Sequence, residues 1–373
     1  MATRIKQRLA WDAADSDVAD SDEEPEVALT DFNGDPDFTS NRSLGKMPPI
    51  DSYTIGWLCA LLEELTAARV FLDAEHDKAE YVSTNDLGAY TLGTIGKHNV
   101  AIGVLPKGEC GTSAAAIAAR DMVHSFPNVR VGLLVGIGGG APYKGRDIRL
   151  GDVVVSTPTG GRGGVMQYDF GKVLQGAPFQ PTGFLNQPPH ILRAAVADLE
   201  SDHEIYGNEI HETIQKLLRR YRNLQKKYQR PNEDRLYKSD FVHAPSNVCC
   251  FGFNDNPSNE VERSSRELDD EDPRIHYGLI ASTNNVMKDA IMRDELVAKY
   301  GILCFETEAA GLMNHFPCLV IRGICSYSDS HQNTAWQGYA AMTAAAYAKS
   351  LLCKLAPRRV AAQTKIEDLP DGN

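Results

Sequence analysis

The stretch TIGWLCALLEELTAARVFL at positions 54–72 determines the fold that we expect for this chain. Its first eight residues form a continuous apolar run of strand length, and residues 63–72 have the apolar spacing of a helix. A strand that is apolar throughout is buried on both faces, as in parallel sheets covered by helices. The stretch therefore predicts a strand followed by a helix that covers it.

The same alternation continues along the chain. An Ala-rich helix is expected over 112–125 and a final helix over 336–355. Apolar strands that alternate with helices predict an α/β fold with a mixed, mostly parallel central sheet flanked by helices. Strands are expected at 88–96 and 99–105, joined by a hairpin turn, and at 129–137, 152–157, 277–282, 301–305 and 318–326.

Composition divides the chain into unequal parts. Residues 1–48 are acidic and rich in serine, and such a segment cannot bury enough apolar surface to offset its ordering entropy, so we predict a disordered tail. One domain is expected over 49–357, followed by a flexible tail over 358–373. Residues 202–275 interrupt the strand–helix pattern with a basic amphipathic helix (208–228) and a polar stretch, which indicates an insertion or lid.

Overall charge and cysteine spacing exclude several classes of protein. The net charge of −12 argues against a surface that coats nucleic acid or binds anionic membranes, and the basic helix of the insertion is better explained as a solvated face. No apolar run reaches the roughly 18 residues of a membrane span. The eight cysteines show no zinc-site spacing, so we expect no metal and reduced thiols in the cytoplasm, with the nucleus as the alternative.

Candidate site residues follow the predicted strands, because ligands of open α/β sheets collect at the carboxyl ends of the strands. Glu64 comes just after the first strand, although an acidic residue in the first helical turn is also ordinary. Gly108, Gly111 and Thr112 lie in a strand-to-helix turn, where backbone N–H groups can approach a ligand oxygen. A third position is 136–140, where Gly138 and Gly139 form either a tight turn or a bed for a flat ring.

A fourth position has two carboxylates at the end of an apolar strand. Glu306 and Glu308 are costly to bury without partners, and a pair of vicinal hydroxyls is a suitable partner for a carboxylate. Arg322 on the next strand can pair with either of them. A purely structural ion pair is the alternative interpretation.

Taken in order, these segments resemble the nucleoside phosphorylase/nucleosidase superfamily, which includes purine nucleoside phosphorylase, uridine phosphorylase and methylthioadenosine/S-adenosylhomocysteine nucleosidase. The likeness covers about Tyr53 to Leu355 outside the insertion. The sequences of residues 167–172 and 276–282 are similar to those of the fungal branch of the superfamily. The matching segments are 55–64, 136–140, 147–156, 306–311 and 322–324.

The resemblance implies a role for each carboxylate. Glu64 matches the general base that activates water, Glu308 the carboxylate that holds the ribose diol, and Glu306 the acid beside the water. Thr307 stands where a methionine usually packs under the sugar. Arg322 matches the arginine beside the nucleophile.

The base-binding end departs from the family pattern. Ser282 and Asn284 match the region that flanks the base, but Ser326 stands where an Asp that protonates the leaving base is expected. Asp329 can replace it only if the loop shifts. An altered enzyme, a binding-only relative and a substituted variant all remain open.

The resemblance implies cleavage of the N-ribosidic bond of purine nucleosides, adenosine-like ones preferred, by a nucleosidase. Water is favoured as nucleophile because Pro106 and Glu109 replace the Arg and Ser of the phosphorylases. The alternatives are a phosphate-dependent phosphorylase, with Lys107 or Arg149 supplying charge, and a nucleoside-binding module with impaired catalysis. We expect no cofactor, apart from inorganic phosphate for a phosphorylase. The expected partners are a small nucleoside and further copies of the chain, with neither nucleic acid nor membrane.

Overall fold

A computed structural model describes residues 46–78, 83, 86, 88–242, 257–264, 266, 273–331 and 334–369. The tail predicted over 1–48 lies outside the described residues except for its last three, so that prediction remains untested. Within the described part, no helix is long and apolar enough to cross a membrane.

The first half of the sheet is built around β1 (Tyr53–Cys59). This strand pairs in parallel with β4 (His98–Val104) on one side and with β5 (Val131–Gly140) on the other. Beyond β4, the hairpin partner β3 (Ala89–Ile95) and the short β2 (Ala74–Glu75) run antiparallel and form the edge. The predicted hairpin and the predicted buried strands are thus present.

The second half of the sheet closes on itself. From β5 the order runs through β12 (Cys318–Ser326), β6 (Val153–Ser156), β10 (Ile275–Ser282) and β11 (Ile302–Glu306), and β7 (Val165–Gln167) also pairs with β10. β11 then pairs back with the end of β5, where Phe305 lies opposite Gly139. Five strands therefore form a closed ring, and the ends of β5, β11 and β12 are held together.

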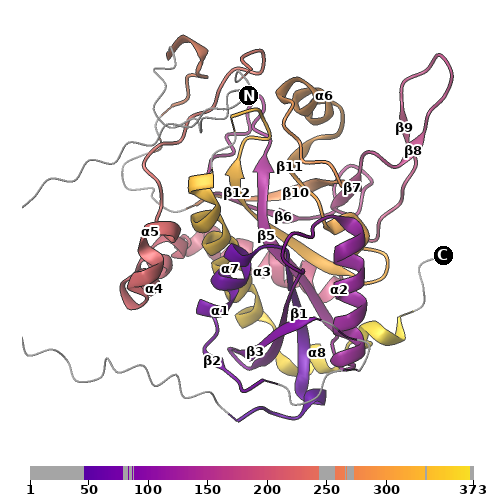
Figure 1. The fold of residues 1–373 in the computed structure, drawn as a ribbon, viewed down its shortest axis with the longest axis vertical. Helices are drawn as coiled ribbons and strands as arrows, with labels where there is room; N and C mark the ends of the chain where they lie inside the picture. Colours follow the sequence, from indigo (N-terminus) through magenta and orange to yellow (C-terminus); the bar gives the residue numbers. More distant parts are fainter. Residues whose placement is uncertain are drawn as a thin grey trace, which may run out of the picture. The chain divides into compact units, whose positions relative to one another are not determined.

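Helices cover both faces of the sheet, which confirms the predicted mixed, mostly parallel α/β fold. α1 (Leu62–Val70), α3 (His190–Tyr206) and α7 (Gln337–Lys354) share one apolar core with β1 and β5. On the other side of these strands lies α2 (Thr112–Ser125), and Figure 1 shows it opposite α7. α6 (Ala290–Tyr300) packs against β11.

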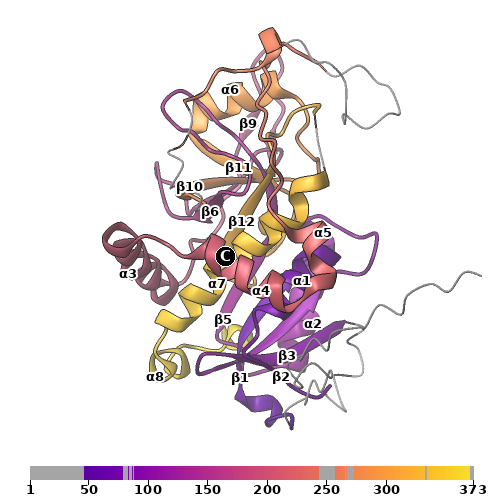
Figure 2. The same ribbon diagram turned by 90° about the vertical axis from the view of Figure 1, so that its left-hand side faces the viewer.

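The insertion packs more closely than the sequence predicts. The single helix expected over 208–228 is two helices, α4 (Ile210–Arg220) and α5 (Gln225–Tyr228), separated by a short 3-10 turn. The apolar face of α4 is buried in the same core as α7, and Figure 2 shows both helices lying against α7. The insertion therefore covers the helix layer.

The flexible tail expected from residue 358 is partly ordered. α8 (Pro357–Ala361) and a 3-10 turn (Ile366–Asp368) follow α7, and the side chains of Val360 and Ile366 are buried in the two main cores. The segment is polar overall, and its composition therefore did not indicate that these two apolar side chains are buried.

The contact between β12 and α7 leaves no room for a side chain at Gly323. A Cβ there would lie 1.8 Å from the backbone oxygen of Ala340. We expect Gly323→Ala to lower the free energy of unfolding by at least about 1–3 kcal/mol, the usual cost of overpacking, as measured by urea denaturation. Gly183→Ala is the control, because its Cβ would meet only the ring edge of exposed Phe170 at 3.2 Å. Equal stability of the two variants would contradict the packing described.

Candidate active site

The ends of β1, β5, β11 and β12 surround a cavity of about 310 Å³. Its walls include predicted site residues from α1, β5, β12 and β11 with the turn that follows it, together with residues at the start of α7. The predicted residues that line it are Glu64, Gly138, Gly139, Glu306, Thr307, Glu308 and Ser326.

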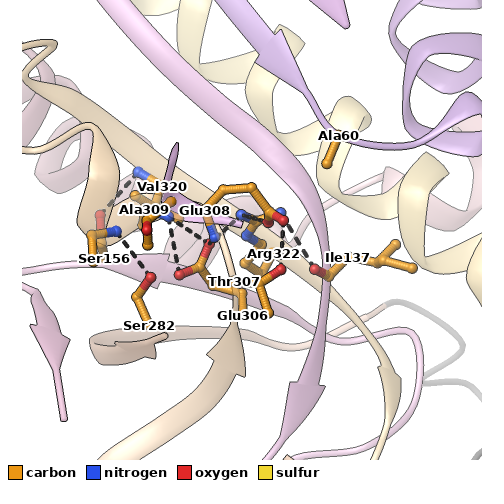
Figure 3. A network of polar contacts seen from close by, with 12 residues as sticks. Ala60, Ile137, Ser156, Ser282, Glu306, Thr307, Glu308, Ala309, Val320 and Arg322 are labelled. Carbon is orange, nitrogen blue, oxygen red and sulfur yellow. Dashed lines mark hydrogen bonds and ion pairs between the residues drawn. The ribbon is translucent and has the colours of Figure 1, made fainter. Parts of the chain in front are cut away.

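Arg322 on β12 is the centre of the polar network in Figure 3. Its side chain is 1% exposed, and its Nη2 donates to Glu306 and, over 3.0 Å, to Oε2 of Glu308. Its Nη1 lies 3.9 Å from Oε1 of Glu64 and donates to the backbone oxygen of Ile137. Burial alone lowers the pKa of this guanidinium, but the three carboxylates together hold it above its usual value.

Glu64 is turned back over the end of β1 and is buried. One of its oxygens accepts the N–H groups of Ala60 and Leu61 at 2.7 and 3.0 Å, and the other accepts that of Ile137 at 2.8 Å. Burial and the nearby Glu308 raise the pKa of Glu64, while Arg322 and these N–H donors oppose the rise. A Cβ at Gly136 would lie 2.3 Å from its Oε1, so only glycine fits beside this carboxylate.

Glu306 is held by the protein from several sides. Its carboxylate accepts the N–H groups of Glu308 and Ala309 at 3.0–3.2 Å, in addition to the bond from Arg322. Burial raises its pKa, and Arg322 opposes that rise. These bonds fix the carboxylate of Glu306 in the wall of the cavity.

Glu308 joins two elements that are far apart in the sequence. Its Oε1 accepts the Thr307 hydroxyl at 2.5 Å and the N–H of Gly111 at 3.3 Å, and its Oε2 accepts Arg322. Because Glu308 lines the cavity, its carboxylate lies where a ligand can reach it.

The turn before α2 is occupied by groups of the protein itself. The backbone N–H and the hydroxyl of Thr112 both donate to the side-chain oxygen of Asn284, at 2.9 and 3.0 Å. Gly108 is exposed, and a Cβ there would meet no atom within 4 Å. Of the predicted ligand-binding residues, these three and Gly111 lie outside the described lining of the cavity.

The end of the cavity near β12 carries hydroxyls. Ser326 lines it, whereas Asp329 does not, and the carboxylate of Asp329 accepts the N–H of His331 at 3.0 Å. Ser282 lies beneath the wall, where its hydroxyl accepts the N–H of Ala310 at 2.9 Å.

All the charged side chains in the described lining of the cavity are acidic. Its described lining has three carboxylates and no basic side chain. Arg149 is engaged elsewhere, with Asp147 at 2.7 Å and the backbone oxygen of Ser264, and Lys107 lies in the exposed turn before α2. In the described part of the chain, no group of His, Cys, Asp or Glu side chains is arranged to hold a metal ion.

Several lining residues were missed by the sequence analysis. Val286, Thr334 and Gln337 lie in loops or at the start of a helix, and no periodicity or motif marks them, whereas Cys110 lies within the predicted turn of Gly108 and Gly111. Ser328 lies beside Ser326, and its only signal in the sequence is its nearness to the strand end.

Solved structures of similar fold come from bacterial nucleosidases. Futalosine hydrolase of Helicobacter pylori matches with a TM-score of 0.51 and 16% identity, over 82% of this chain and 99% of that one. The 5′-methylthioadenosine/S-adenosylhomocysteine nucleosidase of the same organism matches with a TM-score of 0.51 and 15% identity, over 82% and 99% of the two chains. The corresponding nucleosidase of S. pneumoniae has a TM-score of 0.51 at 16% identity, over 82% and 100%.

A sequence relative and a family pattern give the assignment. A nucleotide-binding leucine-rich repeat (NLR)-like protein of Hyaloscypha variabilis is 43% identical over 308 residues, which are 83% of this chain and 30% of that protein. The chain thus spans less than a third of the length of this relative. The sequence pattern of the phosphorylase superfamily matches residues 54–355, and the chain therefore belongs to the phosphorylase superfamily.

Proposed function

We propose that this chain cleaves the N-ribosidic bond of purine nucleosides, adenosine-like ones preferred, with water as the nucleophile. The observation that carries the proposal is the cavity itself. Three carboxylates from α1, the end of β11 and the turn after it surround the cavity with Arg322 buried behind them, and its described lining has no basic side chain.

The carboxylates suit a reaction in which positive charge develops on the sugar. Glu308 accepts hydrogen bonds from the vicinal ribose hydroxyls, while Arg322 and the Gly111 N–H fix its orientation. Water attacks C1′ as the bond from C1′ to the base breaks, and the electron pair of that bond leaves with the base. Glu64 takes the proton from the water, and the carboxylates stabilise the oxocarbenium-like state.

Phosphate is the less suitable nucleophile for two physical reasons. A phosphate dianion beside three carboxylates would suffer like-charge repulsion in a poorly solvated site, about 4 kcal/mol for each pair of unit charges at 4 Å. The N–H groups that start α2, which favour anions, already donate to Glu308 and Asn284.

A nucleoside-binding module is the second candidate function. Ser326 favours it, because a serine hydroxyl has no pKa suited to protonating a leaving base. The NLR-like name of the relative, of which the matched region is 30%, also fits a recognition module within a larger protein.

We expect free purine base to appear when the protein is incubated with adenosine, inosine or guanosine without phosphate, and uridine to remain intact. Chromatography with detection of ribose and ribose-1-phosphate measures the products. Ribose-1-phosphate that forms only with added phosphate would overturn the choice of water. Tight binding without product, followed by turnover in Ser326→Asp, would identify the binding module.

Glu64 generates a prediction about pH. A base must be deprotonated to accept a proton from water, and burial raises the pKa of Glu64. We therefore expect kcat/KM to fall as the pH drops through the pKa of Glu64, which lies above the pKa of an ordinary glutamate. Glu64→Gln should lower kcat by roughly 10²–10⁴, remove this acid limb and leave nucleoside affinity nearly unchanged.

Glu63→Gln is the matched control for Glu64→Gln. Glu63 is the preceding residue in α1, and its carboxylate pairs with Lys227 at 2.6 Å. An equal loss of kcat in Glu63→Gln and Glu64→Gln would contradict a catalytic role for Glu64.

We also propose that the chain associates with copies of itself through the hairpin of β8 (Gly171–Lys172) and β9 (Gln180–Pro181). Five large apolar side chains of residues 170–184 are exposed, among them Val173 at 89% and Phe184 at 76%, and grouped exposed apolar side chains are typical of interaction surfaces. Sedimentation should show an oligomer that Val173→Asp combined with Phe184→Asp shifts towards monomer. A wild-type monomer at micromolar concentration would contradict this proposal.

A further inference from the structure

Ser328 combines two features that cost free energy in the folded protein. Its φ is 53°, and it is the single non-glycine residue with positive φ in the part of the chain that the structure describes. Its side chain is buried, with the residue 1% exposed, and its hydroxyl has no hydrogen-bond partner among the described residues. A residue that is both strained and unsatisfied calls for a functional explanation.

Ser328 lies beside the ligand cavity, at the same end as Ser326. Ser328 lines a narrow space that adjoins the main cavity and shares Gly139, Phe305 and Ser326 with it. A Cβ at Gly139 would lie 2.2 Å from the Ser328 oxygen and 3.2 Å from the Ser326 oxygen. The two hydroxyls therefore lie around the same glycine, which leaves them room at the end of the cavity.

Neighbouring residues hold the strained loop in place. The hydroxyl of Tyr327 accepts Nη1 of Arg263 at 2.7 Å and donates to Asp234 at 2.5 Å. The backbone oxygen of Tyr327 accepts a hydrogen bond from Nη1 of Arg293 at 2.6 Å. A backbone conformation that is rare for serine persists when contacts on the neighbouring residue fix it from several sides.

We propose that Ser328, together with Ser326, is a specificity-determining residue that binds the polar edge of the purine base. The proposal rests on the proposed function, since it takes Glu308 as the ribose-binding group. It adds a second hydroxyl to the base-binding end, where the family pattern expects a single carboxyl group.

Two hydroxyls select a broader class of base than a carboxylate does. A carboxyl group has at most one proton to donate, whereas two hydroxyls have two, and each hydroxyl can also rotate and accept. The pair can donate to N7 and accept from a 6-amino group, or donate to both N7 and a 6-oxo group. We therefore expect the preference for adenosine-like nucleosides to extend to 6-oxo purines, with adenosine and inosine bound within about tenfold of each other.

Calorimetric titration with adenosine and inosine tests the proposal. Ser328→Ala should weaken the binding of both by about 3- to 10-fold, the usual effect of one neutral hydrogen bond. Ser328→Gly should weaken binding equally and yet raise the thermal midpoint of the free protein, because glycine relieves the positive φ and removes the unsatisfied hydroxyl. Damage to the fold would lower stability and affinity together, so the opposite signs distinguish the two explanations.

Ser330→Ala is the matched control. This hydroxyl lies two residues away and contacts Nδ1 of His331 at 3.5 Å, and we expect wild-type affinity from the variant. Unchanged affinity in both Ser328 variants, or inosine bound more than about tenfold more weakly than adenosine, would overturn the inference and leave the proposed function standing. A wild-type protein that binds no purine nucleoside would overturn both.

Discussion

The buried guanidinium of Arg322 is the interaction on which the rest of the site depends. Three carboxylates from two separate elements meet around it, and a group of like charges at this burial is stable only with a cation among them. Removing one partner of a buried pair typically costs about 3–5 kcal/mol, because the remaining charge has no compensation. The closed ring of strands brings β11 and β12 close enough for this contact.

The α/β class and the buried strands could be predicted because continuous apolar runs and helical spacing are local signals. The closing contact between Phe305 and Gly139 could not, because it joins residues far apart in the chain and leaves no periodic trace. The break between α4 and α5 was also missed, since the apolar spacing of 208–228 continues through the turn.

The residues of the site also divide into those that the sequence predicts and those that it does not. Glu64, Glu306, Glu308 and Arg322 were selected from the sequence as residues near strand ends, and the structure brings them together. Thr112 and Asn284 were expected at the ligand, but they bond to each other, a pairing of segments that only the tertiary fold determines. Ser328 was not predicted, because a positive φ at serine depends on its surroundings rather than on the residue type.

The hydrogen bonds that hold the Tyr327 side chain have a consequence for how this pocket can evolve. Asp234 and Arg263 belong to the insertion, and they hold the loop that carries Ser328 without lining the described ligand cavity. Changes in the insertion can therefore move the loop that carries Ser328 while every residue that lines the cavity stays the same. If Ser328 binds the base as proposed, two family members with identical pocket residues and different insertions differ in ligand preference, and a comparison of pocket residues alone groups them wrongly.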